Sequence, residues 1–327
     1  MTQRLNMVEA IDQALQAEML RDHKMIVLGE DVGRDGGVFR VTDGLVQRFG
    51  EDRVIDMPLG ESGIVGMAIG MAIAGYHPVA EIQFSGFVYP AYDQLVSHAA
   101  RMRNRSRGEF TVPLVVRMPY GGGIRALEHH SESMEAIFAH VPGLKVVVPA
   151  DPYEAKGLLT AAVRDPDPVV FFEPARVYRA IKTDVPEESY TLPLGKARVV
   201  REGRDITAIA WGAHVRTLKE AAQKLEAEDA ADVEIIDVRS LAPFDYETVI
   251  ASVVKTGRAV IVHEAPRTCG FGAEISAQIM ERAVLHLEAP VVRVTGFDTP
   301  PPLSKLEDYF QPDVDSVVEA IRGCLRF

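Results

Sequence analysis

The chain has 327 residues, enough for about two domains, and 47% hydrophobic and 25% charged residues are ordinary for a globular protein. Its formal net charge of −12 argues against nucleic acid or an anionic membrane as the main partner. The two cysteines are too few for a disulfide framework, and no stretch is long and apolar enough to predict a membrane span. The N-terminus also lacks the apolar core of a signal peptide. We therefore expect a cytoplasmic protein.

The first 180 residues alternate between helix and strand patterns. A helix is predicted first, because Met7, Ile11, Leu15 and Met19 repeat at helical spacing. Further helices are predicted at residues 42–49, 62–75, 90–105 and 152–163, and strands at 25–28, 53–56, 78–84, 112–118, 145–148 and 168–172. Strands separated by helices predict an α/β domain with a mostly parallel sheet.

The alternation stops and then starts again. Residues 179–198 have little periodicity, so we assign residues 1–180 to one domain, 181–198 to a linker and 199–327 to a second domain. In the second domain, strands are predicted at 206–211, 233–238, 259–263 and 291–295, and helices at 214–228, 245–255 and 273–285. The chain is therefore expected to form two parallel-sheet domains.

The most informative stretch is residues 55–75, where a short strand and a Pro-Gly turn lead into a long uncharged segment. Gly63, Gly66 and Gly70 share one helical face, which allows close approach of another backbone or a ligand. Glu61 is the one carboxylate at the start of that helix. Its carboxylate either stabilises the N-terminus of the helix or takes part in catalysis with a shifted pKa. The segment alone does not decide between these two roles.

Polar side chains follow four predicted strands of the first domain, at the edge where ligands gather in open α/β sheets. Glu30 follows the strand at 25–28, Glu61 the strand at 53–56 and Gln83 the strand near 78–82. His129 and His130 come after the strand at 112–118. Four such loops on one edge predict a functional site, with a surface histidine pair as the plain alternative for the last loop.

Two kinds of site are not supported. Adjacent histidines rarely aim at one metal ion, and no Cys or His cluster accompanies them, so we expect one catalytic and one structural or exposed histidine. The chain also lacks a phosphate-binding loop and a Gly-Asp-Gly run followed by an Asn, and Gly270-Phe-Gly272 departs from a dinucleotide fingerprint.

Motifs along nearly the whole chain resemble the beta chain of the thiamine-diphosphate-dependent, decarboxylating component of 2-oxo acid dehydrogenase complexes. The pyruvate and branched-chain types are the most similar. The matching stretches include Leu28-Gly-Glu-Asp-Val-Gly33, Arg53-Val-Ile-Asp56, Pro58-Leu-Gly-Glu61, Glu81-Ile-Gln-Phe84, Pro113-Leu-Val-Val-Arg117, His130-Ser131 and Arg293-Val-Thr-Gly-Phe-Asp298. The resemblance implies a transketolase-like pyrimidine-binding domain followed by the family's C-terminal domain.

The resemblance also implies roles for particular residues. Glu61 matches the glutamate that bonds the aminopyrimidine of the cofactor and thereby favours its reactive form. His130 matches the active-site histidine that serves substrate turnover and transfer to the lipoyl group. Other cofactor contacts are matched by Glu30, Leu59, Gly60 and Gln83, and a substrate-contacting segment by Phe87, Val88, Tyr89 and Pro90. A potassium site of some members is matched by Leu114, Ala162, Val163, Asp165 and Asp167.

The missing Gly-Asp-Gly run fits this family, whose alpha chain binds the diphosphate and its magnesium. The resemblance thus implies half an active site, a heterotetramer of two alpha and two beta chains, a 2-oxo acid substrate and a lipoyl-bearing acyltransferase partner. Acetoin dehydrogenase is a close alternative, as is a non-catalytic interaction subunit. A self-contained transketolase-type transferase is disfavoured by the absent magnesium motif.

Overall fold

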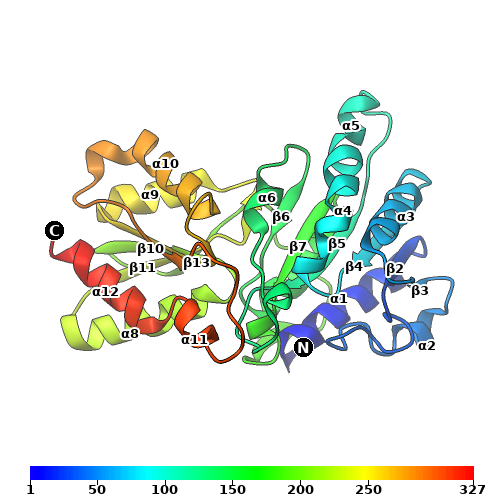
Figure 1. The fold of residues 1–327 in the computed structure, drawn as a ribbon, viewed down its shortest axis with the longest axis horizontal. Coiled ribbons are helices and arrows are strands. Elements are labelled where there is room, and N and C mark those ends of the chain that lie inside the picture. The colour runs from blue at the N-terminus through cyan, green and yellow to red at the C-terminus, as the bar shows by residue number, and fades with distance from the viewer.

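Two parallel-rich sheets form the framework of the chain in the computed structural model, which describes residues 1–327 (Figure 1). The first has seven strands in the order β12-β6-β7-β5-β4-β2-β3, and the second has five in the order β14-β13-β10-β11-β9. The first-sheet strands are β2 (Met25–Gly29), β3 (Val54–Asp56), β4 (His77–Glu81), β5 (Val115–Tyr120), β6 (Lys145–Val147), β7 (Val169–Pro174) and β12 (Ser240–Ala242). The second-sheet strands are β9 (Arg198–Arg201), β10 (Ile206–Ala210), β11 (Val233–Asp237), β13 (Ala259–Pro266) and β14 (Val292–Gly296).

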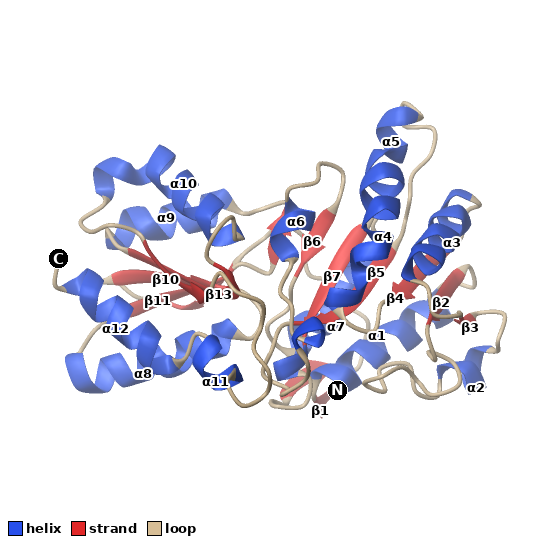
Figure 2. Cartoon of the chain, in the orientation of Figure 1, coloured by secondary structure: helices blue, strands red, loops and turns tan.

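Helices cover both faces of the first sheet (Figure 2). On one face lie α1 (Met7–Arg21) and α7 (Pro152–Val163), whose apolar side chains join one buried cluster with the sheet. On the other lie α3 (Glu61–Ile73) and α4 (Tyr89–Asp93), within a second cluster. A capping box starts α1, because the Asn6 side chain accepts from the amide of Glu9 while the Glu9 carboxylate accepts from the amide of Asn6.

Both faces of the second sheet are covered as well (Figure 2). Its helices are α8 (His214–Asp229), α9 (Tyr246–Thr256), α10 (Phe271–Ala283) and α12 (Val314–Leu325). The cluster that contains α3 and α4 continues into α9 and α10, so one apolar core runs through both sheets. Burial on this scale is the main stabilising contribution to the fold.

The predicted α/β architecture is confirmed, and the differences are local. The helix expected at 90–105 is divided into α4, a π-helical turn (Gln94–His98), a 3₁₀ turn (Ala99–Arg101) and α5 (Met102–Arg105). Within residues 181–198, the strand β8 (Thr183–Pro186) pairs antiparallel with β1 (Thr2–Leu5). Such four-residue strands are too short to give a periodic signal.

Further elements also lie outside the predicted set, among them β9 and the short helix α6 (Glu135–Ala139). The strand β12 leaves the second half of the chain and pairs antiparallel with β6 at the edge of the first sheet. Near the C-terminus, α11 (Glu307–Phe310) precedes α12, whose N-terminus is capped by the side chain of Asp313. No helix of the chain combines the length and apolarity needed to cross a membrane.

Candidate active site

The four loops predicted to carry the site follow four neighbouring strands, β3, β2, β4 and β5. The strands run parallel, with Gly29 opposite both Asp56 and Glu81, and Glu81 opposite Arg117. Their carboxyl ends therefore lie along one edge, and the following loops meet there. Each loop carries one of the predicted polar groups: Glu30, Glu61, Gln83 or the histidine pair.

Two carboxylates from neighbouring loops act on each other at this edge. Glu61 is the first residue of α3 and is half-buried, and Glu30, which follows β2, is 9% exposed. Burial and the nearby Glu61 carboxylate raise the pKa of Glu30, while a hydrogen bond from the Gly60 amide opposes that rise. Because two neighbouring carboxylates repel each other when both are charged, they favour a ligand that shares a proton with one of them.

The two histidines have different surroundings. His130 lies edge-on to Phe84 and Phe87, with ring centroids 4.5 and 5.0 Å away, and its Nδ1 is buried with no hydrogen-bond partner. His129 is exposed, and its Nδ1 lies 3.6 Å from a carboxylate oxygen of Glu132. An unpaired buried ring nitrogen is unusual in a folded protein and calls for a functional explanation, so the geometry favours His130 over His129 as the catalytic histidine.

Backbone contacts hold the histidine loop against the turn that follows β4. The Ser85 hydroxyl donates to the carbonyl of Glu132 at 2.8 Å, and the Gly121 amide donates to the same carbonyl at 3.0 Å. The Tyr89 hydroxyl donates to the Glu132 carboxylate at 2.6 Å, and burial and this carboxylate raise the pKa of Tyr89. The loop is thereby attached to β5 and to the turn after β4.

Gly86 lets these two segments come together. A Cβ at Gly86 would lie 2.0 Å from the carbonyl oxygen of His129, so Gly86→Ala must displace the histidine loop. We expect the free energy of unfolding to fall by about 1–3 kcal/mol, measured by urea denaturation. The matched control is Gly63→Ala in α3, where a Cβ meets no atom within 4 Å and helix propensity favours alanine by ~1 kcal/mol. Equal stability of the two variants would contradict the close-approach argument.

The remaining predicted contacts lie around the same edge with different exposure. Leu59 is 85% exposed, and Tyr89 and Pro90 are exposed as well. Phe87 is half-buried against His130, whereas Val88 is fully buried in the core and presents no surface to a substrate.

A buried ion cluster beneath the site was missed from the sequence. Arg117 on β5 donates Nε and a terminal nitrogen to the two carboxylate oxygens of Glu173 on β7, both at 2.7 Å, and pairs with Glu81 on β4. All three side chains are buried. Because the cluster ties three adjacent strands together directly below the loops, it holds their carboxyl ends in register. A charged residue inside each of three apolar strands was the available signal.

The five residues predicted to bind potassium lie at the opposite edge of the sheet. The Leu114 carbonyl accepts from Val169, and the Ala162 carbonyl accepts from Asp165. The Asp165 carboxylate is paired with Lys145 at 2.6 Å. The chain contains no group of three or more metal-ligating side chains, so a cation here would depend on backbone carbonyls.

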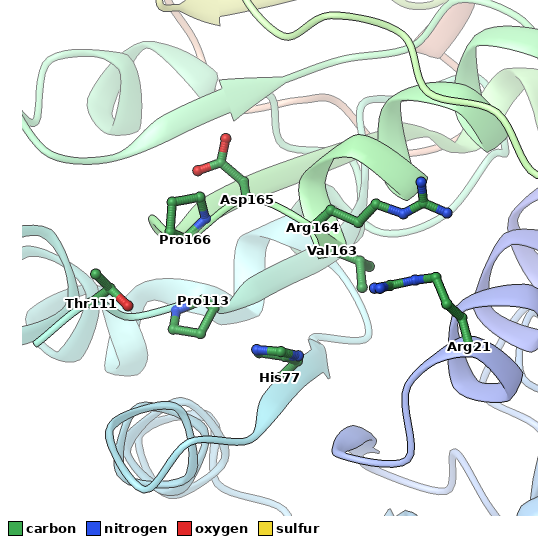
Figure 3. Close-up of a pocket in the computed structure, with 8 residues that line it drawn as sticks. All are labelled: Arg21, His77, Thr111, Pro113, Val163, Arg164, Asp165 and Pro166. Carbon is green, nitrogen blue, oxygen red and sulfur yellow. The ribbon is translucent and has the colours of Figure 1, made fainter.

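A cavity of about 290 Å³ opens beside this segment (Figure 3). Val163, Arg164 and Asp165 line one side of it, with Arg21 and His77 also on its wall. His77 begins β4, so the cavity lies at the amino ends of the strands, away from the candidate site. Its nearby charges are already paired, since Arg21 and Arg164 both contact Glu18.

Comparison with known proteins agrees with this architecture. The family profile for the transketolase pyrimidine-binding domain matches residues 3–180, and that for the transketolase C-terminal domain matches residues 195–317. The pyruvate dehydrogenase E1 component subunit beta of Acholeplasma laidlawii is 55% identical over 97% of each chain. The protein of the same name from Staphylococcus epidermidis is 49% identical over 99% of each chain.

The chain belongs to the transketolase-like beta-subunit family of 2-oxo acid dehydrogenases. This family depends on thiamine diphosphate. A solved structure described as a split-gene transketolase, an inactive beta4 tetramer, superposes with a TM-score of 0.79 over 98% of each chain. At 23% identity it shows the shared fold alone. Family membership confirms the resemblance drawn from the motifs and the predicted order of the two folds.

Proposed function

We propose that the chain is the beta subunit of a pyruvate or branched-chain 2-oxo acid dehydrogenase, and that together with an alpha subunit it catalyses oxidative decarboxylation with acyl transfer to a lipoyl group. The observation that carries this proposal is the grouping of Glu30, Glu61 and His130 at one sheet edge. Identity of 48–55% to proteins named pyruvate dehydrogenase E1 beta subunits supports the same class of reaction.

The residues at this edge fit thiamine diphosphate. A heteroaromatic base that shares a proton with Glu61 would relieve the repulsion between the two carboxylates, which adds to burial in raising the pKa of Glu30. Glu30, Leu59, Gly60, Glu61 and Gln83 would hold the pyrimidine half of the cofactor. When bound, the cofactor would supply a carbon nucleophile and an electron sink for the bonding pair left behind when carbon dioxide departs. Glu61 would hold the proton on the pyrimidine side, and the aromatic wall formed by Phe84 and Phe87 would exclude water.

His130 is proposed to act on the substrate side of the site. Its imidazole, half-buried against Phe84 and Phe87, would donate or accept a hydrogen bond at the reacting oxygen. Tyr89 and Pro90 lie on the segment that would contact the 2-oxo acid. We further propose that Leu114, Ala162, Val163, Asp165 and Asp167 bind potassium through their carbonyls, and that magnesium is held with the diphosphate by the alpha subunit.

The site has no element that would hold a diphosphate, because no Gly-Asp-Gly run with a downstream Asn occurs in the sequence. The purified chain alone is therefore expected to have no decarboxylase activity. Adding the alpha subunit should restore thiamine-diphosphate-dependent decarboxylation, followed with an artificial electron acceptor. The control is the alpha subunit alone. Clear activity of the isolated chain would refute the split-site proposal.

A second candidate is the beta subunit of an acetoin dehydrogenase, because that reaction places the same demands on Glu61 and His130. The reconstituted pair should be offered pyruvate, branched-chain 2-oxo acids and acetoin in parallel. Acyl transfer to a lipoyl domain of the acyltransferase component then separates a complete dehydrogenase from a non-catalytic interaction subunit.

A further inference from the structure

The segment before the histidine loop is held by carboxylates from the second half of the chain. The Gly122 amide donates to Oε2 of Glu264 at 2.9 Å. The Gly123 amide donates to Oε1 of Glu307 at 2.7 Å, and the Arg125 amide donates to Oε2 of the same carboxylate at 2.9 Å. Three backbone amides within four residues thus meet two acids that lie 142 to 184 positions away in sequence.

The glycines in this segment are required by that approach. Gly121 and Gly123 have φ values of +78° and +90°, which L side chains rarely adopt. A Cβ at Gly121 would lie 2.2 Å from Oε1 of Glu264, and one at Gly122 would lie 3.0 Å from Oε1 of Glu307. The backbone therefore approaches the carboxylates more closely than a residue with a side chain would allow.

Both acids are buried, so their carboxyl oxygens need hydrogen-bond donors. Glu264, on β13, is 5% exposed, and Glu307, at the start of α11, is 4% exposed. Burial raises the pKa of Glu264 overall, and hydrogen bonds from the Gly122 amide and the Gln311 side chain oppose that rise only in part. Hydrogen bonds from amides to a buried carboxylate are stronger than neutral ones, so this contact restrains the segment more than an ordinary turn would.

The restrained segment leads directly to the proposed catalytic group. Residues 121–127 run into the 3₁₀ turn Glu128–His130, and the Gly121 amide closes the loop on the carbonyl of Glu132. The loop that carries His130 is thus held at its start by the contacts of Gly121 and at its end by those of Glu132. We propose that Glu307 and Glu264 are positioning residues, through which the C-terminal domain fixes the loop that carries His130.

The proposal is tested by hydrogen exchange on the full-length chain with Glu307→Gln. A glutamine keeps one acceptor oxygen but replaces the other with a donor, so one of the Gly123 and Arg125 amides loses its partner. We expect exchange of the peptides covering residues 121–131 to accelerate about ten-fold or more. The matched control is Asp308→Asn, since the neighbouring Asp308 is exposed and bonds only the Arg125 side chain. Exchange equal to that control would overturn the proposal.

Should Glu307→Gln fail to fold, Glu264→Gln provides the same comparison through the amide of Gly122. Exchange in residues 121–131 that stays at the wild-type rate in Glu264→Gln would likewise overturn the proposal. Both readouts are independent of catalysis.

A second measurement asks whether the restraint matters for turnover, and this part depends on the function proposed above. In the assembled enzyme, Glu307→Gln should lower kcat about ten-fold while cofactor affinity stays unchanged, because Glu307 accepts its hydrogen bonds from Gly123 and Arg125 and from none of Glu30, Glu61 and Gln83. Loss of cofactor affinity with unchanged kcat would overturn the positioning role. An inactive wild-type assembly would refute the proposed function. The hydrogen-exchange measurement would then still test whether Glu307 and Glu264 restrain the loop.

Discussion

Replacing Glu61 with alanine is expected to lower turnover of the assembled enzyme by ~100- to 10,000-fold, the range of a general acid–base contribution. Glu61 starts α3 at the edge where burial and the Glu61 carboxylate raise the pKa of Glu30, and under the proposed function it would share a proton with the cofactor's pyrimidine. Turnover should be measured at saturating thiamine diphosphate, so that weakened binding does not mimic a loss of chemistry. Folding and assembly should persist, because the side chain is only half-buried.

The control for this variant is Glu51→Gln, a neutralised acid that is exposed and remote from the sheet edge. Near-wild-type turnover of Glu61→Ala, together with a lower thermal midpoint, would assign Glu61 to stabilising the helix terminus instead. That outcome would support the stabilisation of the helix N-terminus by Glu61, which is the alternative that the sequence left open.

His130→Ala should abolish most of the overall activity and of the reductive acylation of the lipoyl domain, while cofactor affinity remains. The reason is that the imidazole lies against Phe84 and Phe87 with a buried Nδ1 that no protein group satisfies. A loss of at least ~100-fold is expected for a positioned acid–base group. Acylation of the isolated lipoyl domain is the measurement, with cofactor affinity determined in parallel.

His129→Ala is the matched control, because its side chain is exposed beside Glu132. It should retain most activity. An inactive His129→Ala with a working His130→Ala would show that the motif alignment is displaced by one residue, and the assignment of the site would then fail.

Much of this site was predictable because parallel strands impose it. The strand patterns ending near Gly29, Asp56 and Glu81 place their loops on one edge, whatever the detailed packing. The sequence also led to the expectation that only one of the two adjacent histidines is catalytic. It could not choose between them from residue chemistry alone, since the choice depends on the contacts of Phe84 and Phe87 with the ring of His130.

Other features depend on contacts between distant segments, which periodicity does not report. The pairing of β1 with β8 joins the two ends of the first 186 residues, and each strand has only four residues. The contact between Glu307 and Gly123 spans 184 positions. The buried Arg117 could have been noticed as a charge within an apolar strand, but its two partners could be identified only from the register of β4, β5 and β7.

The strand β12 has a consequence for how the chain can be divided. It comes from the second half of the sequence and covers the outer edge of β6. A fragment truncated after residue 198 would expose the unpaired backbone of β6, a ready template for edge-to-edge association between copies. The amino-terminal half is therefore a poor unit for separate expression or gene fusion. Fragments intended for study should extend beyond Ala242, so that the first sheet keeps the strand that protects it from self-association.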